Sequence, residues 1–199
     1  MKKVTAFLSA LMVSATILTV PTQAETAFDE NVDYMSVMVV SATIGDMETG
    51  RAAEQARNAK IEALGSGYTM ISFDDLFLLS KIIYAEAGSA WLPMDWKMCV
   101  GEVVLNRVAS PEFPNTIAEV LAQPGQYYGQ NSSYFNRLLP SETCVIAAQQ
   151  LLEGQRIMND ETVVFQANFT QGSGIHTALY DGALGWTYFC HSARPWIYA

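Results

Sequence analysis

The segment from Ser72 to Gly88 constrains the fold of this chain most strongly. Its apolar residues recur at the spacing of one helical face: Leu76, Leu79, Ile82 and Ile83. Ser72 precedes Asp75 by three residues, an arrangement that caps a helix N-terminus, and Gly88 is a typical helix end. The sequence therefore predicts an amphipathic helix from about Phe73 to Ala87.

Further helices are expected after this segment. Apolar spacing and turn residues predict them at 93–109, 116–122 and 141–153. From residue 162 the chain becomes β-branched and aromatic, and glycines interrupt it at short intervals, which is typical of a small strand layer. The expected fold class is α+β and mainly helical, with a small C-terminal β layer.

The N-terminus has the pattern of an export signal. Lys2 and Lys3 precede an apolar run that ends at Val20, and Ala24 offers the small residue that signal peptidase needs. An uncleaved membrane anchor is the alternative, but the run is short and contains five Ser and Thr residues. We expect a signal peptide at 1–24, no stable membrane insertion after its cleavage, and no other membrane-spanning segment.

Residues 25–70 are expected to form a spacer or a partly ordered N-terminal segment ahead of a catalytic domain at 71–199. The stretch 45–64 is rich in Ala, Glu, Arg, Lys and Gln, which predicts a polar helix outside the core. The preceding residues 34–43 are more apolar, and their pattern fits either a strand or a helix. From its position alone, the segment is a candidate for control by a regulatory partner.

Charge argues against one class of partner. The chain has a formal net charge of −9, and loss of residues 1–24 would remove two lysines and no acidic residue. Nucleic acid is therefore not an expected partner, because phosphate binding needs a basic surface. Affinity for a glycan would have to come from a local groove.

Cysteine and histidine patterns do not indicate a metal site. Cys99, Cys144 and Cys190 are widely spaced, so they fit either one disulfide with a spare thiol or three buried small side chains. A zinc amidase would need metal ligands, yet His176 and His191 are the chain's two histidines and form no HExxH motif. We expect no metal and no cofactor.

Glu86 is the candidate catalytic residue. It follows Leu79 and Ile83 at helical spacing, which places a carboxylate on the apolar face near the helix C-terminus. Desolvation and the helix dipole would both raise its pKa, as a general acid requires. The alternative is an ordinary ion pair with Lys81 or Arg107.

Four linked motifs carry a resemblance to a known family. They are Ile83-Tyr84-Ala85-Glu86-Ala87, Gly101-Glu102-Val103-Val104-Leu105-Asn106-Arg107-Val108, Ser110-Pro111-Glu112-Phe113-Pro114-Asn115-Thr116 and Gln123-Pro124-Gly125-Gln126-Tyr127. In order and spacing they resemble the SleB-type cell wall hydrolases. A weaker likeness continues through Val164-Phe165-Gln166 and 185–189.

The resemblance implies a lysozyme or lytic-transglycosylase-like domain that cleaves peptidoglycan glycan strands, with Glu86 as its acid. The bond would be the β-1,4 linkage between N-acetylmuramic acid, or muramic lactam, and N-acetylglucosamine. With one acid, closure of the muramic 6-hydroxyl onto C1 is favoured over hydrolysis by water. A second carboxylate, if used, would be Glu102 or Asp95. The expected location is secreted or in the cell envelope, and spore cortex and vegetative wall both stay open.

Other matched residues have expected roles. Sugar contacts are assigned to Tyr84, Gln126, Tyr127, Phe165 and Gln166. Asn106 and Arg107 lie well inside a helix, which favours a buried structural network. Many family members have a histidine where this chain has Thr187, a departure that keeps open a wall-binding protein without turnover. His191 is a nearby substitute in sequence.

Overall fold

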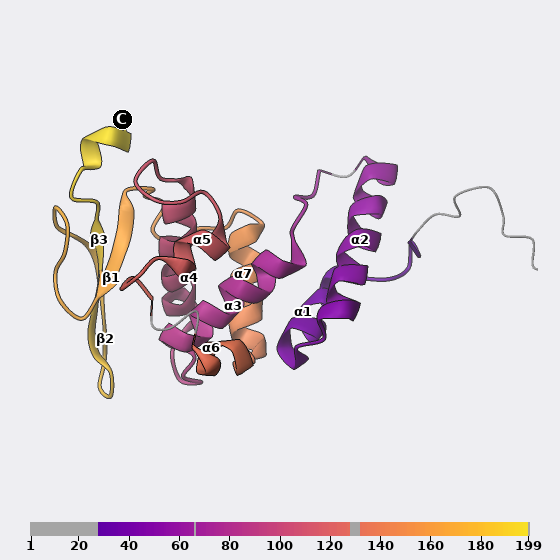
Figure 1. Ribbon diagram of the computed structural model, residues 1–199, viewed down its shortest axis with the longest axis horizontal. Helices are drawn as coiled ribbons and strands as arrows, with labels where there is room; N and C mark the ends of the chain where they lie inside the picture. Colours follow the sequence, from indigo (N-terminus) through magenta and orange to yellow (C-terminus); the bar gives the residue numbers. More distant parts are fainter. Residues whose placement is uncertain (1–27, 66, 128–131, 199) are drawn as a thin grey trace, which may run out of the picture.

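The computed structural model describes residues 28–65, 67–127 and 132–198 (Figure 1). Helices dominate the chain as far as residue 152, and three strands and a short 3-10 helix come after them. The helices are α1 Tyr34–Ile44, α2 Met47–Leu64, α3 Phe73–Ala87, α4 Met94–Ala109, α5 Ile117–Ala122, α6 Ser133–Arg137 and α7 Glu142–Leu152. The remaining elements are β1 Val163–Ala167, β2 Ile175–Asp181, β3 Gly185–His191 and η1 Pro195–Tyr198.

Helix α3 is the centre of the fold, as its apolar face predicts. Ser72 caps it by accepting a hydrogen bond from Asp75 N at 3.4 Å. Helices α4 and α7 pack against α3 and against each other. Gly101 allows this close approach, because a Cβ there would lie 2.4 Å from Leu151 Cδ1 and 2.8 Å from Ile83 Cδ1. The position of α3 is therefore fixed on two sides by the core.

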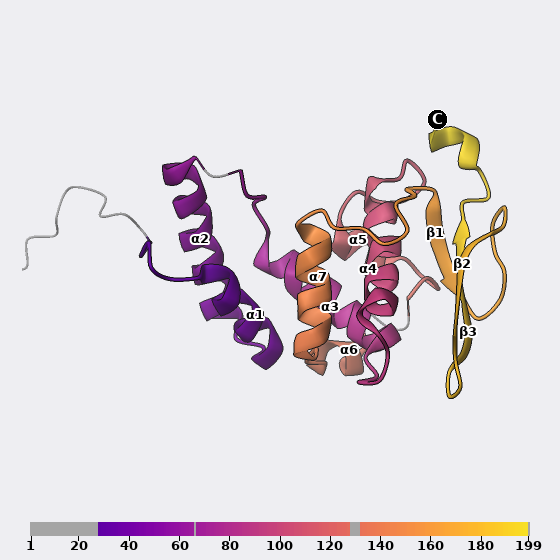
Figure 2. The same cartoon turned by 180° about the vertical axis from the view of Figure 1, so that it is seen from behind.

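The β layer is a single antiparallel sheet with the strand order β1-β3-β2. Strand β1 packs against α4, and buried Val163, Val164 and Phe189 join the sheet to the helices. Figures 1 and 2 show the sheet at one end of the molecule and α1 with α2 at the other. The predicted class, mainly helical α+β with a small C-terminal β layer, is confirmed.

The N-terminal segment corrects one expectation. Residues 34–43 form a helix rather than a strand, and α1 and α2 make a hairpin that packs on α7 and α3. Met38, Ala42 and Ala53 are buried in the common core, although 45–64 was expected to lie outside it. The prediction was wrong on this point because small alanine side chains allow close helix packing without a wide apolar stripe. The boundary between 25–70 and 71–199 stays a prediction.

Two further points concern membrane-spanning segments and the loop between α5 and α7. The signal peptide at 1–24 lies outside the described residues. Within the described parts of the chain, no helix is both long enough and apolar enough to cross a bilayer. The loop contains a short helix that the sequence pattern does not predict, α6, whose cap is Ser132.

Candidate active site

The C-terminal turn of α3 is held by a buried lysine. Lys97 of α4 is 2% exposed, and its Nζ donates to Ala87 O at 2.9 Å, Ser89 O at 2.9 Å and Leu92 O at 3.2 Å. These carbonyls belong to the end of α3 and the loop after it, which the helix itself leaves without partners. Lys97 thereby fixes the turn that carries Glu86. The sequence pattern gave no sign of this role.

Glu86 lies where the end of α3 meets β1. The residue is exposed, although its position on the apolar face of the helix predicted burial. The reason is that α3 ends one residue later. Burial of the carboxyl group nevertheless raises the pKa of Glu86, and a hydrogen bond from Gln166 lowers it. That bond joins Gln166 Nε2 to Glu86 Oε2 at 3.4 Å. The carboxyl group is thus biased toward the protonated form.

The ion-pair alternative for Glu86 is not observed. Lys81 donates instead to Asn136 O at 3.3 Å, and Arg107 Nε donates to Val164 O at 2.6 Å. The salt bridges within the described residues do not include Glu86. The polar contact that the structure gives this acid is therefore a neutral amide.

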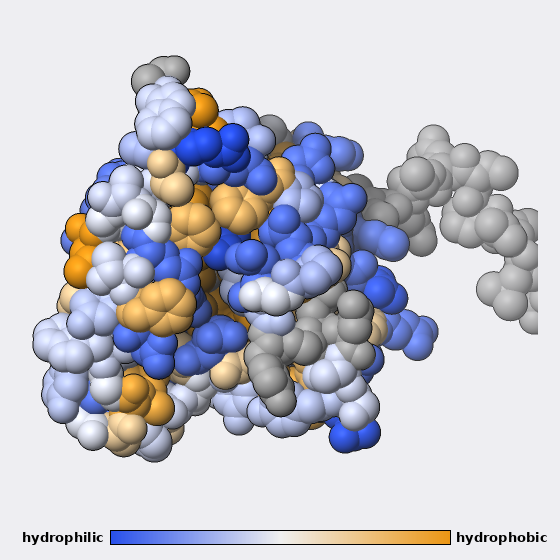
Figure 3. Space-filling model, turned by 60° about the vertical axis from the view of Figure 1, so that its left-hand side comes forward, coloured by the Kyte–Doolittle hydropathy of each residue, from blue (hydrophilic) through white to orange (hydrophobic). Residues whose placement is uncertain are grey.

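Tyr127 and Gln166 bring unpaired polar atoms to the neighbourhood of Glu86. Tyr127 Oη and Gln166 Oε1 are buried and have no hydrogen-bond partner among the described residues. Burial raises the pKa of Tyr127 to about 12; Arg107 opposes this shift and the charge of Glu86 adds to it. Tyr127 therefore keeps its proton at neutral pH. Figure 3 shows that the face carrying the sheet is hollowed, with apolar residues around the hollow.

Arg107 packs between the aromatic residues of this region. Its guanidinium carbon lies 4.9 Å from the ring centre of Phe113, 5.0 Å from that of Tyr127 and 5.9 Å from that of Phe165. Its Nη1 is buried without a hydrogen-bond partner among the described residues. The Arg107 cation therefore contacts three aromatic rings and donates a hydrogen bond to Val164 O of β1. These contacts fix the position of Tyr127 relative to the strand that carries Gln166.

The other predicted sugar contacts are less closely grouped. Tyr84 is half-buried and packs against the core, and its ring lies against Gly88 one turn later. Gln126 is exposed in the loop after α5. The structure gives neither side chain a contact with Glu86.

A buried polar network fixes the neighbouring loop and strand, as expected for Asn106. Its Nδ2 donates to Asp160 O at 2.9 Å and Val163 O at 3.0 Å. Glu102 is fully buried and accepts backbone hydrogen bonds from Ile157, Met158 and Asn159 at 2.8, 3.1 and 3.0 Å. Both oxygens of Glu102 are occupied in this way, so it is unsuited to act as a second catalytic carboxylate. Asp95, the other candidate, is exposed in the first turn of α4.

The cysteines are buried as free thiols, and the two histidines contact each other. Cys99, Cys144 and Cys190 are free and buried, which decides between the two alternatives for them. His176 and His191 contact each other with ring centres 5.5 Å apart, and His191 Nδ1 lies 2.8 Å from Thr162 Oγ1. No group of three or more metal-binding side chains of the His, Cys, Asp and Glu types occurs in the described residues.

Thr187 lies on β3, opposite Leu179 of β2. Gln166 pairs with Phe189, two residues farther along β3, so Thr187 and Gln166 share one face of the sheet. The residue that departs from the family pattern is thus on the face of the sheet from which Gln166 contacts Glu86. His191 lies farther along the strand and contacts Thr162 and His176.

Comparison with known families matches residues 93–194 to the cell wall hydrolase family. The match covers just over half of the chain. The chain belongs to the cell wall hydrolase family. This confirms the resemblance to SleB-type enzymes. Arg107, Tyr127 and Gln166 lie within the matched residues, and Glu86 lies seven residues before them.

Curated relatives agree with this membership. A spore cortex-lytic enzyme of Halalkalibacterium halodurans is 26% identical over 146 residues, which are 69% of this chain and 40% of that protein. The spore cortex-lytic enzyme of Bacillus subtilis is 32% identical over 91 residues, 42% of this chain and 26% of that protein. This chain therefore spans less than half the length of either relative.

Two solved structures are also similar. One is the catalytic domain of the Bacillus cereus SleB protein, with 26% identity, a TM-score of 0.46, and coverage of 63% of this chain and 93% of that one. The other is the catalytic domain of the germination-specific lytic transglycosylase SleB from Bacillus anthracis. It has 23% identity, a TM-score of 0.46, and coverage of 63% of this chain and 98% of that one.

Proposed function

We propose that this protein is an exported enzyme that cleaves peptidoglycan glycan strands, with Glu86 as general acid and then general base. Family membership supports the substrate class. The observation that carries the mechanism is a carboxyl group whose pKa burial raises and whose hydrogen-bond partner is the neutral amide of Gln166. Such an acid stays protonated closer to neutral pH, as cleavage of a weakly basic glycosidic oxygen requires.

The proposed reaction is lytic transglycosylation. Glu86 donates its proton to the glycosidic oxygen while the bond from that oxygen to muramic C1 breaks. The muramic 6-hydroxyl then attacks C1 and returns its proton to Glu86, which gives a 1,6-anhydro product and restores the acid. Burial and the Gln166 hydrogen bond account for the shift in the pKa of Glu86, and no carboxylate of the described residues contributes to it. This favours one acid over the paired carboxylates of many hydrolases.

The residues around Glu86 have proposed roles in holding the sugar. Tyr127 Oη and Gln166 Oε1 are buried polar atoms without partners in the described structure, and they suit a sugar hydroxyl and an acetamide N–H respectively. Phe165 and Tyr127 offer ring faces for pyranose stacking. Tyr84 is assigned to the wall of the site and Gln126 to its rim.

A second candidate is a wall-binding protein without turnover. Thr187 favours it, because it stands on the Gln166 face of the sheet at the position where many relatives have a histidine. Either protein would act outside the cell membrane, in the envelope or on the spore.

Mass spectrometry of digested peptidoglycan tests the proposal. The chain from Glu25 onward and its Glu86→Gln variant are incubated with peptidoglycan that contains or lacks muramic lactam. Anhydro-muramic products from the parent, and none from the variant, are expected. Reducing muramic ends would indicate hydrolysis instead.

Glu119→Gln is the matched control, since Glu119 is exposed and its carboxylate only accepts from Thr116 in the cap of α5. It should leave the products unchanged. If the parent protein is folded and releases no product from either substrate, the enzyme proposal is rejected in favour of the wall-binding protein.

A further inference from the structure

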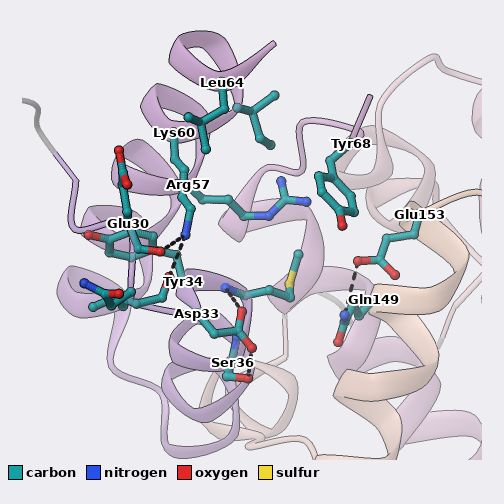
Figure 4. A pocket seen from close by; sticks show the side chains of 14 residues that line it. Glu30, Asp33, Tyr34, Ser36, Arg57, Lys60, Leu64, Tyr68, Gln149 and Glu153 are labelled. Carbon is teal, nitrogen blue, oxygen red and sulfur yellow. Dashed lines mark hydrogen bonds between the residues drawn. The ribbon is translucent and has the colours of Figure 1, made fainter. Parts of the chain in front are cut away.

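A second site lies at the opposite end of the molecule from the sheet. A cavity of about 520 Å³ opens between the α1–α2 hairpin and the C-terminal end of α7 (Figure 4). Its volume is in the range that small-molecule sites occupy. Neither Glu86 nor any residue of the sheet lines it. Most of its lining comes from residues 30–68, ahead of the segment that matches the family.

Arg57 supplies a buried positive charge to this cavity. The residue is 8% exposed, and its Nη1 donates to Thr69 O at 2.9 Å. The salt bridges of the described residues do not include it. Figure 4 shows the guanidinium extending from α2 toward Tyr68, with Glu153 of α7 on the far side of Tyr68. A guanidinium has five N–H donors and binds carboxylates in a two-pronged geometry, so this one is suited to an anionic group.

Carboxylates on the cavity wall restrict which anion fits. Asp33 and Glu153 are near enough for their charges to act on the pKa of Arg57, which desolvation lowers and these two acids raise. Asp33 is already engaged at the start of α1, where it accepts from Met35 N and from Ser36. Glu153 accepts from Gln149 at 3.2 Å through Oε1 and is exposed. A simple anion would be repelled by both acids, whereas a group with adjacent negative and positive charges would match both signs.

The remaining lining adds an apolar surface. The apolar lining residues include Ile61 and Leu64 of α2, Met35 of α1, and Tyr68 from the connection between α2 and α3. Leu64 is 56% exposed and Tyr68 is 73% exposed, so both keep apolar surface available to a ligand. Lys60 does not compete for an anion, because its Nζ donates to Glu30 O at 2.6 Å and Val32 O at 3.2 Å.

We propose that this cavity binds an α-amino carboxylate group that carries an aliphatic chain. Arg57 binds the carboxylate, Glu153 binds the ammonium group, and the aliphatic chain packs on Ile61 and Leu64. Two sources supply this chemistry: a free aliphatic amino acid, and the free end of a diamino acid in a wall peptide. The assignment is independent of glycan cleavage by Glu86.

Calorimetric titration of the full chain tests the proposal with three matched ligands. L-leucine has both charges, 4-methylpentanoate has the carboxylate alone, and 3-methylbutylamine has the amine alone. Leucine should bind at least about tenfold more tightly than either of the others, because each charged hydrogen bond removed costs at least about 1.4 kcal/mol. Equal affinity for leucine and 4-methylpentanoate would overturn the proposal, since the site would then be a plain anion site.

Substitutions of Arg57 and Glu153 test which residue binds the carboxylate of the ligand and which binds its ammonium group. Glu153→Gln should weaken leucine at least about tenfold and leave 4-methylpentanoate unchanged or tighter. Glu142→Gln is the matched control, because Glu142 is exposed on the same helix and does not line this cavity. Arg57→Gln should weaken both carboxylates, and Arg57→Lys should restore part of the loss. Equal leucine affinity in Glu153→Gln and the parent would overturn the assignment.

Competition identifies the source of the ligand. Displacement of leucine by meso-diaminopimelate and by a muropeptide that contains it would assign the site to the wall peptide. Leucine binding without such displacement would assign it to a free amino acid. Absence of binding by both leucine and diaminopimelate would refute the site. Glu86→Gln should bind leucine like the parent, so failure of this inference and failure of the proposed catalysis are distinguishable.

Discussion

The two ends of this molecule use charge in different ways. At the sheet end, Glu86 stands beside a neutral amide, and the nearby cation Arg107 is occupied by three aromatic rings and a carbonyl. At the hairpin end, Arg57 shares a cavity with Asp33 and Glu153. An isolated acid suits proton transfer, because its pKa is free to rise. A mixture of both signs suits recognition of a dipolar group.

The two ends are also held together differently. Lys97, Asn106 and Arg107 secure the sheet end, and each is buried and donates to backbone carbonyls. At the hairpin end, Met38 and Ala42 pack into the common core, and Lys60, which donates to backbone carbonyls, is only half-buried. Substitutions at the two ends should therefore have different effects on glycan cleavage. They should also show how much polar and apolar contacts contribute to the free energy of unfolding.

The largest expected effect separates the two sites by activity. Glu86→Gln should lower the rate of glycan release at least about 100-fold, because it removes the proton donor and keeps the shape of the side chain. Arg57→Gln should leave that rate unchanged, since Arg57 does not contact the Glu86 region. Release of soluble fragments from labelled peptidoglycan measures both. If both variants lose a comparable fraction of the glycan-release rate, the two ends act as one functional unit.

The next effect is on stability at the sheet end. Lys97→Met should lower the free energy of unfolding by about 3 kcal/mol, because the buried carbonyls of Ala87 and Leu92 lose the Lys97 donor and the Ser89 carbonyl keeps only the hydrogen bond from Leu92 N. The comparison at the hairpin end is Lys60→Met, which should cost about 1 kcal/mol because Lys60 is only half-buried. Urea denaturation measures the two values. Equal losses would contradict the contrast in burial.

Apolar packing at the hairpin end gives an effect of similar or smaller size. Met38→Ala should lower the free energy of unfolding by about 2 kcal/mol, because a fully buried side chain leaves a cavity between α1 and the core. The urea transition should remain a single step. Two separate transitions would instead make the hairpin an independent unit, as the spacer prediction implies.

A pH profile tests the environment of Glu86. The hydrogen bond from Gln166 lowers the pKa of Glu86, so Gln166→Ala should raise it further. The acid then remains protonated to higher pH, and the alkaline decline of kcat should move upward. Asn168→Ala is the control, since Asn168 is exposed just beyond β1. A downward shift in Gln166→Ala would contradict the assigned sign.

The smallest effect is expected for a surface ion pair. Arg51 and Asp74 lie 2.9 Å apart and are 55% and 52% exposed. Arg51→Ala should change the free energy of unfolding by less than about 1 kcal/mol, and less in high salt. A larger loss would show that α2 and α3 are joined by charge rather than by their apolar contact.

The sequence predicted elements whose signals are local. Ser72 with Asp75 located the start of α3, and Ser110-Pro111 located the end of α4. The β-branched residues after Asn159 located β1. The short α6 and η1 were missed, because elements of this length have too few residues for a periodic pattern.

Predictions about the site were limited by long-range contacts. Glu86 was selected from its helix position together with the family resemblance, but its hydrogen-bond partner Gln166 comes from 80 residues later. Lys97 was missed because a lysine in an apolar helix does not reveal that its acceptors are the carbonyls of an earlier turn. The aromatic setting of Arg107 depends on residues from the α4–α5 loop, the loop after α5 and β1, which only the tertiary fold brings together.

The three buried thiols have a consequence for how the chain matures. Because Cys99, Cys144 and Cys190 are all free, no covalent cross-link has to form before the native packing is reached. Refolding should proceed at the same rate with and without a reducing agent, and it should need no oxidase or disulfide isomerase. The fold is therefore equally accessible in a reducing compartment and in an oxidising one.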